Sequence, residues 1–226
     1  MKINDQQRSL VKTARVAGIW YLLLAISGIL GFLVVHPRVY DADPGQTLTN
    51  LVEGETLARL RLLLEFAIIV SQALTAIWFY RLFKGINEWA ALATGIWGTV
   101  NAVAIMISAI SMGAAISVAL SSQIMEDKVV LIDLLTKLIS NAWGIGALFF
   151  GLWLMPMGYL VASSKRMPVW LGRTLLIGGA GYVISAFVKY MGVSGPWAGI
   201  LTIPASIGEF WMIGYLLIFG IRSVNE

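Results

Sequence analysis

The stretch WAALATGIWGTVNAVAIMISAISMGAAISVALSS, residues 89–122, contains no charged side chain, and only Gly95, Gly98 and Gly113 could interrupt a helix there. At ~1.5 Å per residue such a helix would be ~50 Å long, whereas the hydrocarbon core of a bilayer is ~30 Å thick. Residues 128–162 form a similar stretch. The two predict a helical hairpin that turns at QIMEDK, residues 123–128, and stands above the outer membrane surface. A kink with a re-entrant or interfacial segment is the alternative.

The composition places the whole chain in a membrane. Of its 226 residues, 58% are hydrophobic and 12% are charged, whereas soluble domains carry about 25% charged residues. A surface so poor in charge must be solvated by lipid, so we expect an all-α polytopic membrane protein. The absence of cysteine excludes disulfides, thiolate metal sites and a cysteine nucleophile. The single histidine, His36, excludes two-histidine haem ligation and His-based zinc sites, and we expect no cofactor.

Six apolar segments are close to the ~20 residues that cross the hydrocarbon. The first is longer than the ~7–15-residue apolar region of a signal peptide and has no cleavage site after it, so we interpret it as a retained helix. We therefore expect a single six-helix membrane domain over residues 1–226, with an outer hairpin at about 113–140. The expected spans are about 16–35, about 62–79, one starting near 89, one ending near 162, about 170–190 and about 200–221.

Lysine and arginine predict the orientation, because cytoplasmic loops are enriched in both. If both termini are cytoplasmic, ten of the 16 lysines and arginines lie inside and six lie outside. The net charge of +4 therefore reflects bases placed beside the spans, and it is not the footprint of a nucleic-acid-binding protein. We expect the N- and C-termini to be cytoplasmic.

The longest polar connection joins the first two spans, at about residues 36–61. Pro44-Gly45 is typical of a turn, and TLTNLV, residues 47–52, predicts a short amphipathic helix on the outer surface that ends at Gly54. His36 and Trp143 fall near the outer boundary of the membrane. We interpret both as interfacial residues, because amphipathic rings are enriched at that depth.

Several ionisable or amide side chains fall inside the predicted spans, where they are costly and normally face protein or water. Glu65 and Lys189 lie sixteen residues from the nearest cytoplasmic base of their spans, about 24 Å away at 1.5 Å per residue. Asn101 and Glu209 lie thirteen residues from the charged cytoplasmic end of theirs, about 20 Å away. All four therefore fall in the outer third of the bilayer.

The spacing of these residues predicts a bundle with a polar interior that opens to the outside. Positions three, four or seven apart share one helical face, and polar residues recur at such spacings on four spans. We expect Glu65, Glu209, Asn101 and Lys189 to line or close a cavity, with Arg59 or Arg61 at its mouth. Gln72, Ser206 and Tyr182 lie on the same polar stripes and complete the candidate ligand-binding set.

Each candidate also has a purely structural interpretation. Asn101, Gln72 and the serine and threonine residues can simply hold neighbouring helices together through hydrogen bonds. Glu65 can pair with Arg61 one turn earlier. Lys189 can reach the outer interface with its long side chain, or pair with Glu209. Because no base lies near Glu209 on its own helix, it is the strongest functional candidate.

The ordered set of short motifs resembles the bacterial membrane family called domain of unknown function 4386 over nearly the whole chain. Arg59 followed six residues later by Glu65, and the pair Gly208-Glu209, match positions that are similar in that family. The resemblance implies a multi-pass protein of the bacterial cytoplasmic membrane and brings no activity. The motifs are RVAGIWYLL from Arg15, YRLFK from Tyr80, FGLWLMPMGYL from Phe150, LG at 171–172, GGAGY from Gly178 and IGEFW from Ile207.

Three classes of function remain open. The first is binding or transport of a small polar solute, or of a proton, in the outward cavity. The second is a structural protein that docks a membrane partner, or another copy of itself, through the outer hairpin and first loop. The third, an intramembrane enzyme, is the least favoured, because no nucleophile–base or metal arrangement is visible. Apart from the lipid bilayer, the expected partners are therefore a small ligand or a membrane protein, and not nucleic acid.

Overall fold

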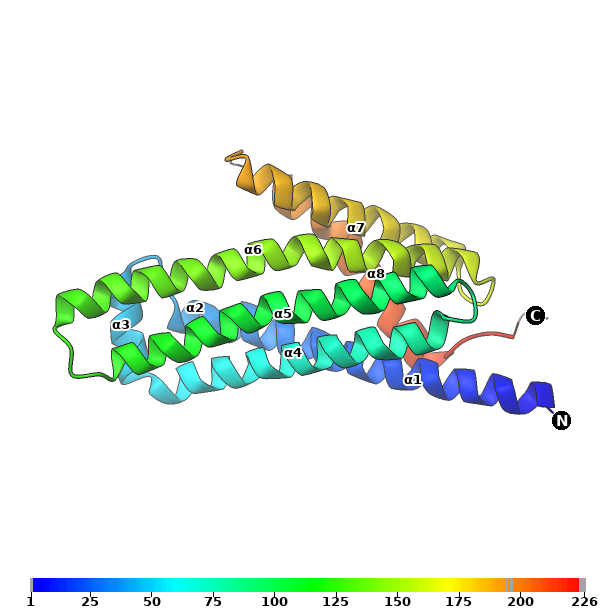
Figure 1. Ribbon diagram of the computed structural model, residues 1–226, viewed down its shortest axis with the longest axis horizontal. Helices are drawn as coiled ribbons and strands as arrows, with labels where there is room; N and C mark the ends of the chain where they lie inside the picture. Colours follow the sequence, from blue (N-terminus) through cyan, green and yellow to red (C-terminus); the bar gives the residue numbers. More distant parts are fainter. Residues whose placement is uncertain (1, 194, 196, 224–226) are drawn as a thin grey trace. The chain divides into compact units, whose positions relative to one another are not determined.

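Long apolar helices make up most of the structure, a computed structural model that describes residues 2–193, 195 and 197–223 (Figure 1). No strand occurs in these described residues, so the all-α prediction is confirmed. A seven-residue π-helical segment, η1, lies within the first long helical run. The elements are α1 (Lys2–Gly28), η1 (Ile29–Val35), α2 (His36–Val39), α3 (Pro44–Glu53), α4 (Glu55–Phe83), α5 (Glu88–Ala119), α6 (Met125–Ser163), α7 (Val169–Tyr190) and α8 (Trp197–Ile218).

Six helical segments of the described chain are long and apolar enough to cross a membrane, as predicted from the sequence. The first runs from Asp5 to Val39 and includes η1 and α2. α4 begins at Glu55, seven residues before the predicted start of the second span, because the acidic first turn continues directly into the apolar segment. The protein is therefore a multi-pass membrane protein by the length and composition of its helices.

The connection between the first two spans folds as the turn and cap residues predict. Asp43 is the N-cap of α3, and its side chain accepts a hydrogen bond from the Gly45 amide. Pro44 occupies the first turn, where its missing N–H costs nothing. Gly54 ends the helix. Leu48 and Leu51 on the apolar face of α3 are almost completely buried, so this helix belongs to a packed core.

The two longest helices of the chain, α5 and α6, are joined by only residues 120–124. Lys128 caps the connection, because its Nζ donates to the Ala119 carbonyl at 3.0 Å. The turn therefore lies a few residues earlier than the predicted QIMEDK segment. In the predicted hairpin region, residues 113–140, α5 covers residues 113–119 and α6 covers residues 125–140, each without a break.

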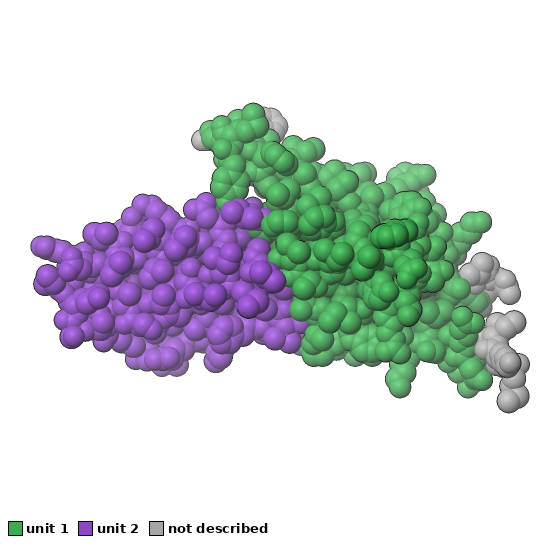
Figure 2. Space-filling view, in the orientation of Figure 1, with its two compact units in different colours: residues 1–22, 71–101, 146–226 green, residues 23–70, 102–145 purple. Residues whose placement is uncertain are grey.

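The chain divides into two compact units, coloured separately in Figure 2. Unit 1 consists of Met1–Leu22, Ser71–Asn101 and Gly146–Glu226, and unit 2 consists of Leu23–Val70 and Ala102–Ile145. Unit 2 has an apolar core of its own, in which Leu51, Met112 and Ile132 are fully buried. Polar residues of the predicted site occur in both units, so each unit is described separately below.

Within unit 1, α7 and α8 pack closely through glycines. A Cβ atom added at Gly178 would overlap the backbone of Ala205, and one added at Gly181 would overlap the Leu201 carbonyl. Small residues allow such close approach of helices in a membrane, where packing rather than the hydrophobic effect drives association.

Candidate functional site

A fully buried ion pair forms the centre of the candidate site in unit 2. Arg61 and Glu65 lie one turn apart on α4, and their Nη1 and Oε2 atoms are 2.7 Å apart. Both side chains are 0% exposed. The pair confirms the structural interpretation of Glu65. Ionised groups lose several kcal/mol of solvation when buried, so such a pair persists only when further hydrogen bonds compensate.

Trp143 of α6 supplies one such hydrogen bond. Its indole Nε1 donates to Oε1 of Glu65 at 2.9 Å, so each carboxylate oxygen accepts one bond. The sequence interpretation of Trp143 as an interfacial belt residue did not include this bond between its indole and the buried carboxylate. Two helices far apart in the sequence meet at Glu65 in this way.

An aromatic wall lies beside the ion pair. The Arg61 guanidinium lies 5.4 Å from the Phe32 ring centroid, a cation–π distance. Phe32 also packs edge-on against Trp143, with centroids 4.4 Å apart. The His36 ring is stacked between Phe32 and Tyr40, at centroid distances of 5.2 and 4.9 Å. His36 is therefore part of the cluster and not only an interfacial residue.

The local backbone of the first span helps to place these groups. Phe32 lies in η1, and π-helical turns are rare and concentrate at functional sites. Gly31, in the same segment, packs against Arg61: a Cβ there would lie 3.4 Å from Nη1. This distance is ordinary van der Waals contact, so position 31 lies directly against the guanidinium. We call Phe32, His36, Tyr40, Arg61, Glu65 and Trp143 together the Arg61 site.

The Arg61 site contains several buried polar atoms that have no hydrogen-bond partner among the described residues. They belong to three side chains from two segments of unit 2 and lie around one guanidinium. Such atoms cost about 1–3 kcal/mol each when left unsatisfied, and native structures contain few of them. They are Nε and Nη2 of Arg61, Nδ1 of His36 and the hydroxyl of Tyr40.

The Tyr40 hydroxyl remains protonated in this environment. Burial raises the pKa of Tyr40 well above its ordinary value of 10. The positive charge of Arg61 opposes that shift in pKa, and the negative charge of Glu65 adds to it. Tyr40 therefore keeps a proton that its hydroxyl can donate, and the hydroxyl lies in the electrostatic field of both members of the ion pair.

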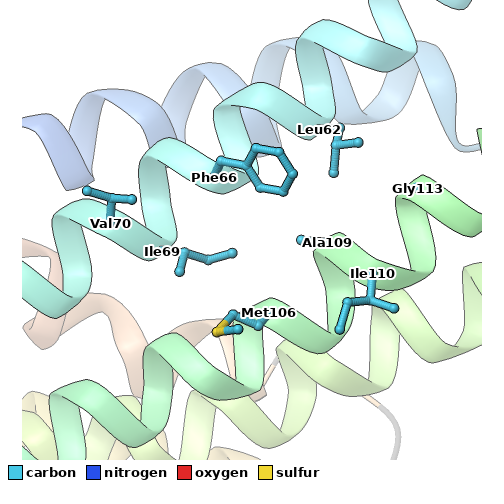
Figure 3. Close-up of a pocket in the computed structure, with 8 residues that line it drawn as sticks. All are labelled: Leu62, Phe66, Ile69, Val70, Met106, Ala109, Ile110 and Gly113. Carbon is cyan, nitrogen blue, oxygen red and sulfur yellow. The ribbon is translucent and has the colours of Figure 1, made fainter.

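A cavity of ≈ 430 Å³ lies elsewhere in unit 2, between α4 and α5, and its lining is apolar (Figure 3). Phe66 and Val70 of α4 face Met106 and Ile110 of α5 across it. These four side chains are also among the strongly exposed hydrophobic residues, as expected where a helix contacts lipid. This cavity suits hydrocarbon and offers no groups for a polar solute.

A second polar contact lies in unit 1, around the strongest sequence candidate. Oε1 of Glu209 accepts a hydrogen bond from the Tyr21 hydroxyl at 2.8 Å. Tyr21 is 1% exposed and packs edge-on against Phe79 and Trp153. In the described part of the chain Glu209 forms no ion pair, so the alternative of a structural pair with Lys189 is not observed.

Comparison with known proteins places the chain in a family. A family model for a domain of unknown function, DUF4386, matches residues 16–220. The chain belongs to the DUF4386 family. This member is also 33% identical over 82 residues to an uncharacterized protein from Archaeoglobus fulgidus, a match that covers 36% of this chain and 48% of that relative. The chain thus matches about half the length of that relative. No solved structure matches this DUF4386 chain.

The structure separates the predicted site residues of this DUF4386 member into two groups. Arg61 and Glu65 belong to unit 2, whereas Gln72, Asn101, Tyr182, Lys189, Ser206 and Glu209 belong to unit 1. Arg61, expected at a cavity mouth, is fully buried, and Arg59 is exposed and pairs with Glu55 at 2.7 Å. Lys189 and Ser206 are exposed. Gln72 of α4 donates to the Gly98 carbonyl of α5 at 3.4 Å, which agrees with its interpretation as a hydrogen-bonding contact between helices.

Sequence reasoning missed the aromatic half of the Arg61 site. Phe32 and Tyr40 were not candidates, because an aromatic residue in or beside an apolar span carries no special signal. One feature could have pointed to them: Phe32, His36 and Tyr40 recur every four residues, so their rings share one helical face. Tyr21 carries no comparable signal, since its partner is 188 positions away.

Proposed function

We propose that this membrane protein binds a small polar solute, and that the solute is held at the Arg61 site. The observation that carries the proposal is the guanidinium of Arg61, which is fully buried yet uses only one of its three nitrogens within the described chain. Aromatic rings together with unpartnered polar atoms are typical of small-molecule sites, which combine apolar walls with a few convergent polar groups.

The energetics favour a ligand over an empty cluster. Four buried unpartnered atoms would each cost about 1–3 kcal/mol, so an empty site would carry a penalty comparable with the whole stability of many domains. A solute that accepts hydrogen bonds from these atoms would recover that free energy on binding. Rigid, already positioned donors also reduce the ordering cost of binding.

The proposed orientation has both termini in the cytoplasm of a bacterial cell, with the α5–α6 connection outside. Its support is the distribution of bases. In unit 1, Arg81, Lys84 and Arg166 line one cavity of ≈ 260 Å³, with Gln6 of the N-terminal helix beside them. Bases gather on the cytoplasmic side of multi-pass proteins. In this orientation the Arg61 site belongs to the outer half of the protein.

A high-resolution structure of the full chain in lipid nanodiscs tests the proposal. We expect non-protein density larger than water within hydrogen-bond distance of Nε and Nη2 of Arg61 and of the Tyr40 hydroxyl. Analysis of small molecules released from the same purified protein would identify the solute. Density for water alone, or side chains packed shut around the guanidinium, would overturn the proposal.

A second candidate function, docking of another protein, has one observation in its favour. Apolar side chains are exposed around the α5–α6 connection, including Ile124 at 71%, Met125 at 67% and Val130 at 69%. If this region stands above the membrane, its exposed apolar side chains would be buried by contact with another protein. Native mass spectrometry in detergent tests whether a second copy of the chain binds this region. Dimers of the wild type that are lost in Val130→Gln would support docking. A monomeric wild type would count against self-association.

A further inference from the structure

The two unpartnered nitrogens of the Arg61 guanidinium have a fixed geometry. Nη1 is used by Glu65, and the unpartnered atoms are Nε and Nη2. These two nitrogens lie on the same edge of the planar group, so their N–H bonds run nearly parallel. This edge matches the two oxygens of a carboxylate or phosphate, and such paired bonds are both stronger and more selective than single ones.

We propose that the solute is a small oxyanion, a carboxylate or a phosphate, bound through two oxygens to Nε and Nη2 of Arg61. This inference rests on the proposed function and names the class of solute. The Tyr40 hydroxyl, which stays protonated, offers a third hydrogen bond to the same group. Since these unpartnered groups are mainly donors, the ligand must supply acceptors, and oxyanion oxygens are acceptors only.

Binding of an anion changes the charge balance of the site. Glu65 already neutralises Arg61, so a bound anion brings one net negative charge into the cluster. Hydrogen bonds from Nε and Nη2 of Arg61 and from the Tyr40 hydroxyl would have to compensate that charge.

The surroundings restrict the size of the anion. Arg61 is 0% exposed, and Gly31, Phe32 and Trp143 close one side of the site. Acetate and inorganic phosphate are suitable probes, since each presents two coplanar oxygens on a compact body. Acetamide is the matched control: it has nearly the same shape as acetate, carries no charge, and offers only one acceptor oxygen.

Equilibrium dialysis of the full chain in maltoside detergent, with labelled acetate, phosphate or acetamide, tests the inference. We expect saturable binding of acetate or phosphate, through paired hydrogen bonds to Arg61. Binding of acetamide without either anion would overturn the oxyanion class and leave solute binding intact. Absence of binding by both anions also overturns it, and water-only density in nanodiscs would remove both proposals.

Variants separate a ligand contact from a structural one. Arg61→Lys keeps a positive charge beside Glu65 but loses the two-nitrogen edge, so we expect anion affinity to fall at least about tenfold. Tyr40→Phe removes an unpartnered hydroxyl and should leave the empty protein at least as stable as before, while anion affinity falls about three- to tenfold. Arg59→Lys, at an exposed arginine of the same helix, is the control and should bind normally. Unchanged affinity in both site variants would contradict the inference.

The same assay distinguishes a free anion from a lipid headgroup. Phosphatidic acid presents a phosphate with the same oxygen geometry as inorganic phosphate. If added phosphatidic acid abolishes acetate binding and phosphatidylcholine does not, the oxyanion is part of a lipid. If neither lipid affects acetate binding, the oxyanion is a free solute. Both results support the oxyanion class, and they assign its source.

Discussion

Trp143 donates its indole N–H to the same carboxylate that binds Arg61, at 2.9 Å and across 78 positions of sequence. The bond connects α6 to the ion pair of α4 inside unit 2. A buried charge pair held only by residues of one helix would be satisfied in any packing of that helix. Because a third side chain comes from another helix, the pair is satisfied only when α4 and the first part of α6 are correctly placed.

Neutralising Glu65 should strongly destabilise the protein. In Glu65→Gln the Arg61 charge remains buried without a counter-charge, which costs about 3–5 kcal/mol. Thermal unfolding in detergent measures the loss. The same helix supplies a matched control, because Arg59 and Glu55 form a pair with the same spacing and the same 2.7 Å distance at the surface. Glu55→Gln should cost less than about 1 kcal/mol, and equal losses in the two variants would refute the argument.

Replacing Trp143 by phenylalanine should cost a smaller amount. The ring contact with Phe32 is largely kept, but Oε1 of Glu65 loses its donor. Hydrogen bonds to charged groups contribute about 1.5–3 kcal/mol, so we expect a destabilisation in that range. Trp89→Phe is the control, because Trp89 is 81% exposed. If the two variants unfold at the same temperature, the indole bond contributes nothing.

These contacts show which parts of the site the sequence could predict. Arg61 and Glu65 are four residues apart on a helix that composition alone identifies, so their pairing follows from helical geometry. The spans and the α3 cap follow from equally local signals. The bonds of Trp143 and Tyr21 do not, because they depend on which helix faces point toward each other. The π-helical turn at Phe32 likewise has no local signature in the sequence.

The Tyr21–Glu209 contact of unit 1 predicts opposite effects for two substitutions. Tyr21→Phe removes the hydroxyl that donates to Oε1 of Glu209, and we expect a loss of about 1.5–3 kcal/mol. Glu209→Gln keeps an acceptor for that hydroxyl and removes a charge that has no counter-ion in the described chain, so stability should stay the same or rise. Thermal unfolding of the two variants tests this order. A destabilised Glu209→Gln would mean that the charge itself has a stabilising partner.

Alanine at Gly181 should separate α7 from α8. The added Cβ would overlap the Leu201 carbonyl, a backbone atom that cannot move without shifting the helix. We expect a loss of about 1–3 kcal/mol, the usual range for overpacking. Gly214→Ala in α8 is the control, since no atom beyond the neighbouring backbone of its own helix lies within 4 Å of the added Cβ, and it should be neutral or slightly stabilising. Equal unfolding temperatures for the two variants would show that the close helix contact does not occur.

The proposed orientation can be measured directly, because the chain contains no cysteine. Single cysteines introduced at exposed positions can therefore be labelled without background. With both termini cytoplasmic, Ala42→Cys and Ser122→Cys should react with a membrane-impermeant maleimide in intact cells. Gly85→Cys and Ser163→Cys should react only after the membrane is permeabilised. All four positions are exposed, so unequal labelling reports sidedness rather than burial.

The opposite labelling pattern would place the Arg61 site in the cytoplasmic half of the protein. The positive-inside distribution predicts otherwise, because ten of the 16 bases would then lie outside. The direction from which an oxyanion reaches Arg61 depends on this result. An outward site meets solutes before they cross the membrane.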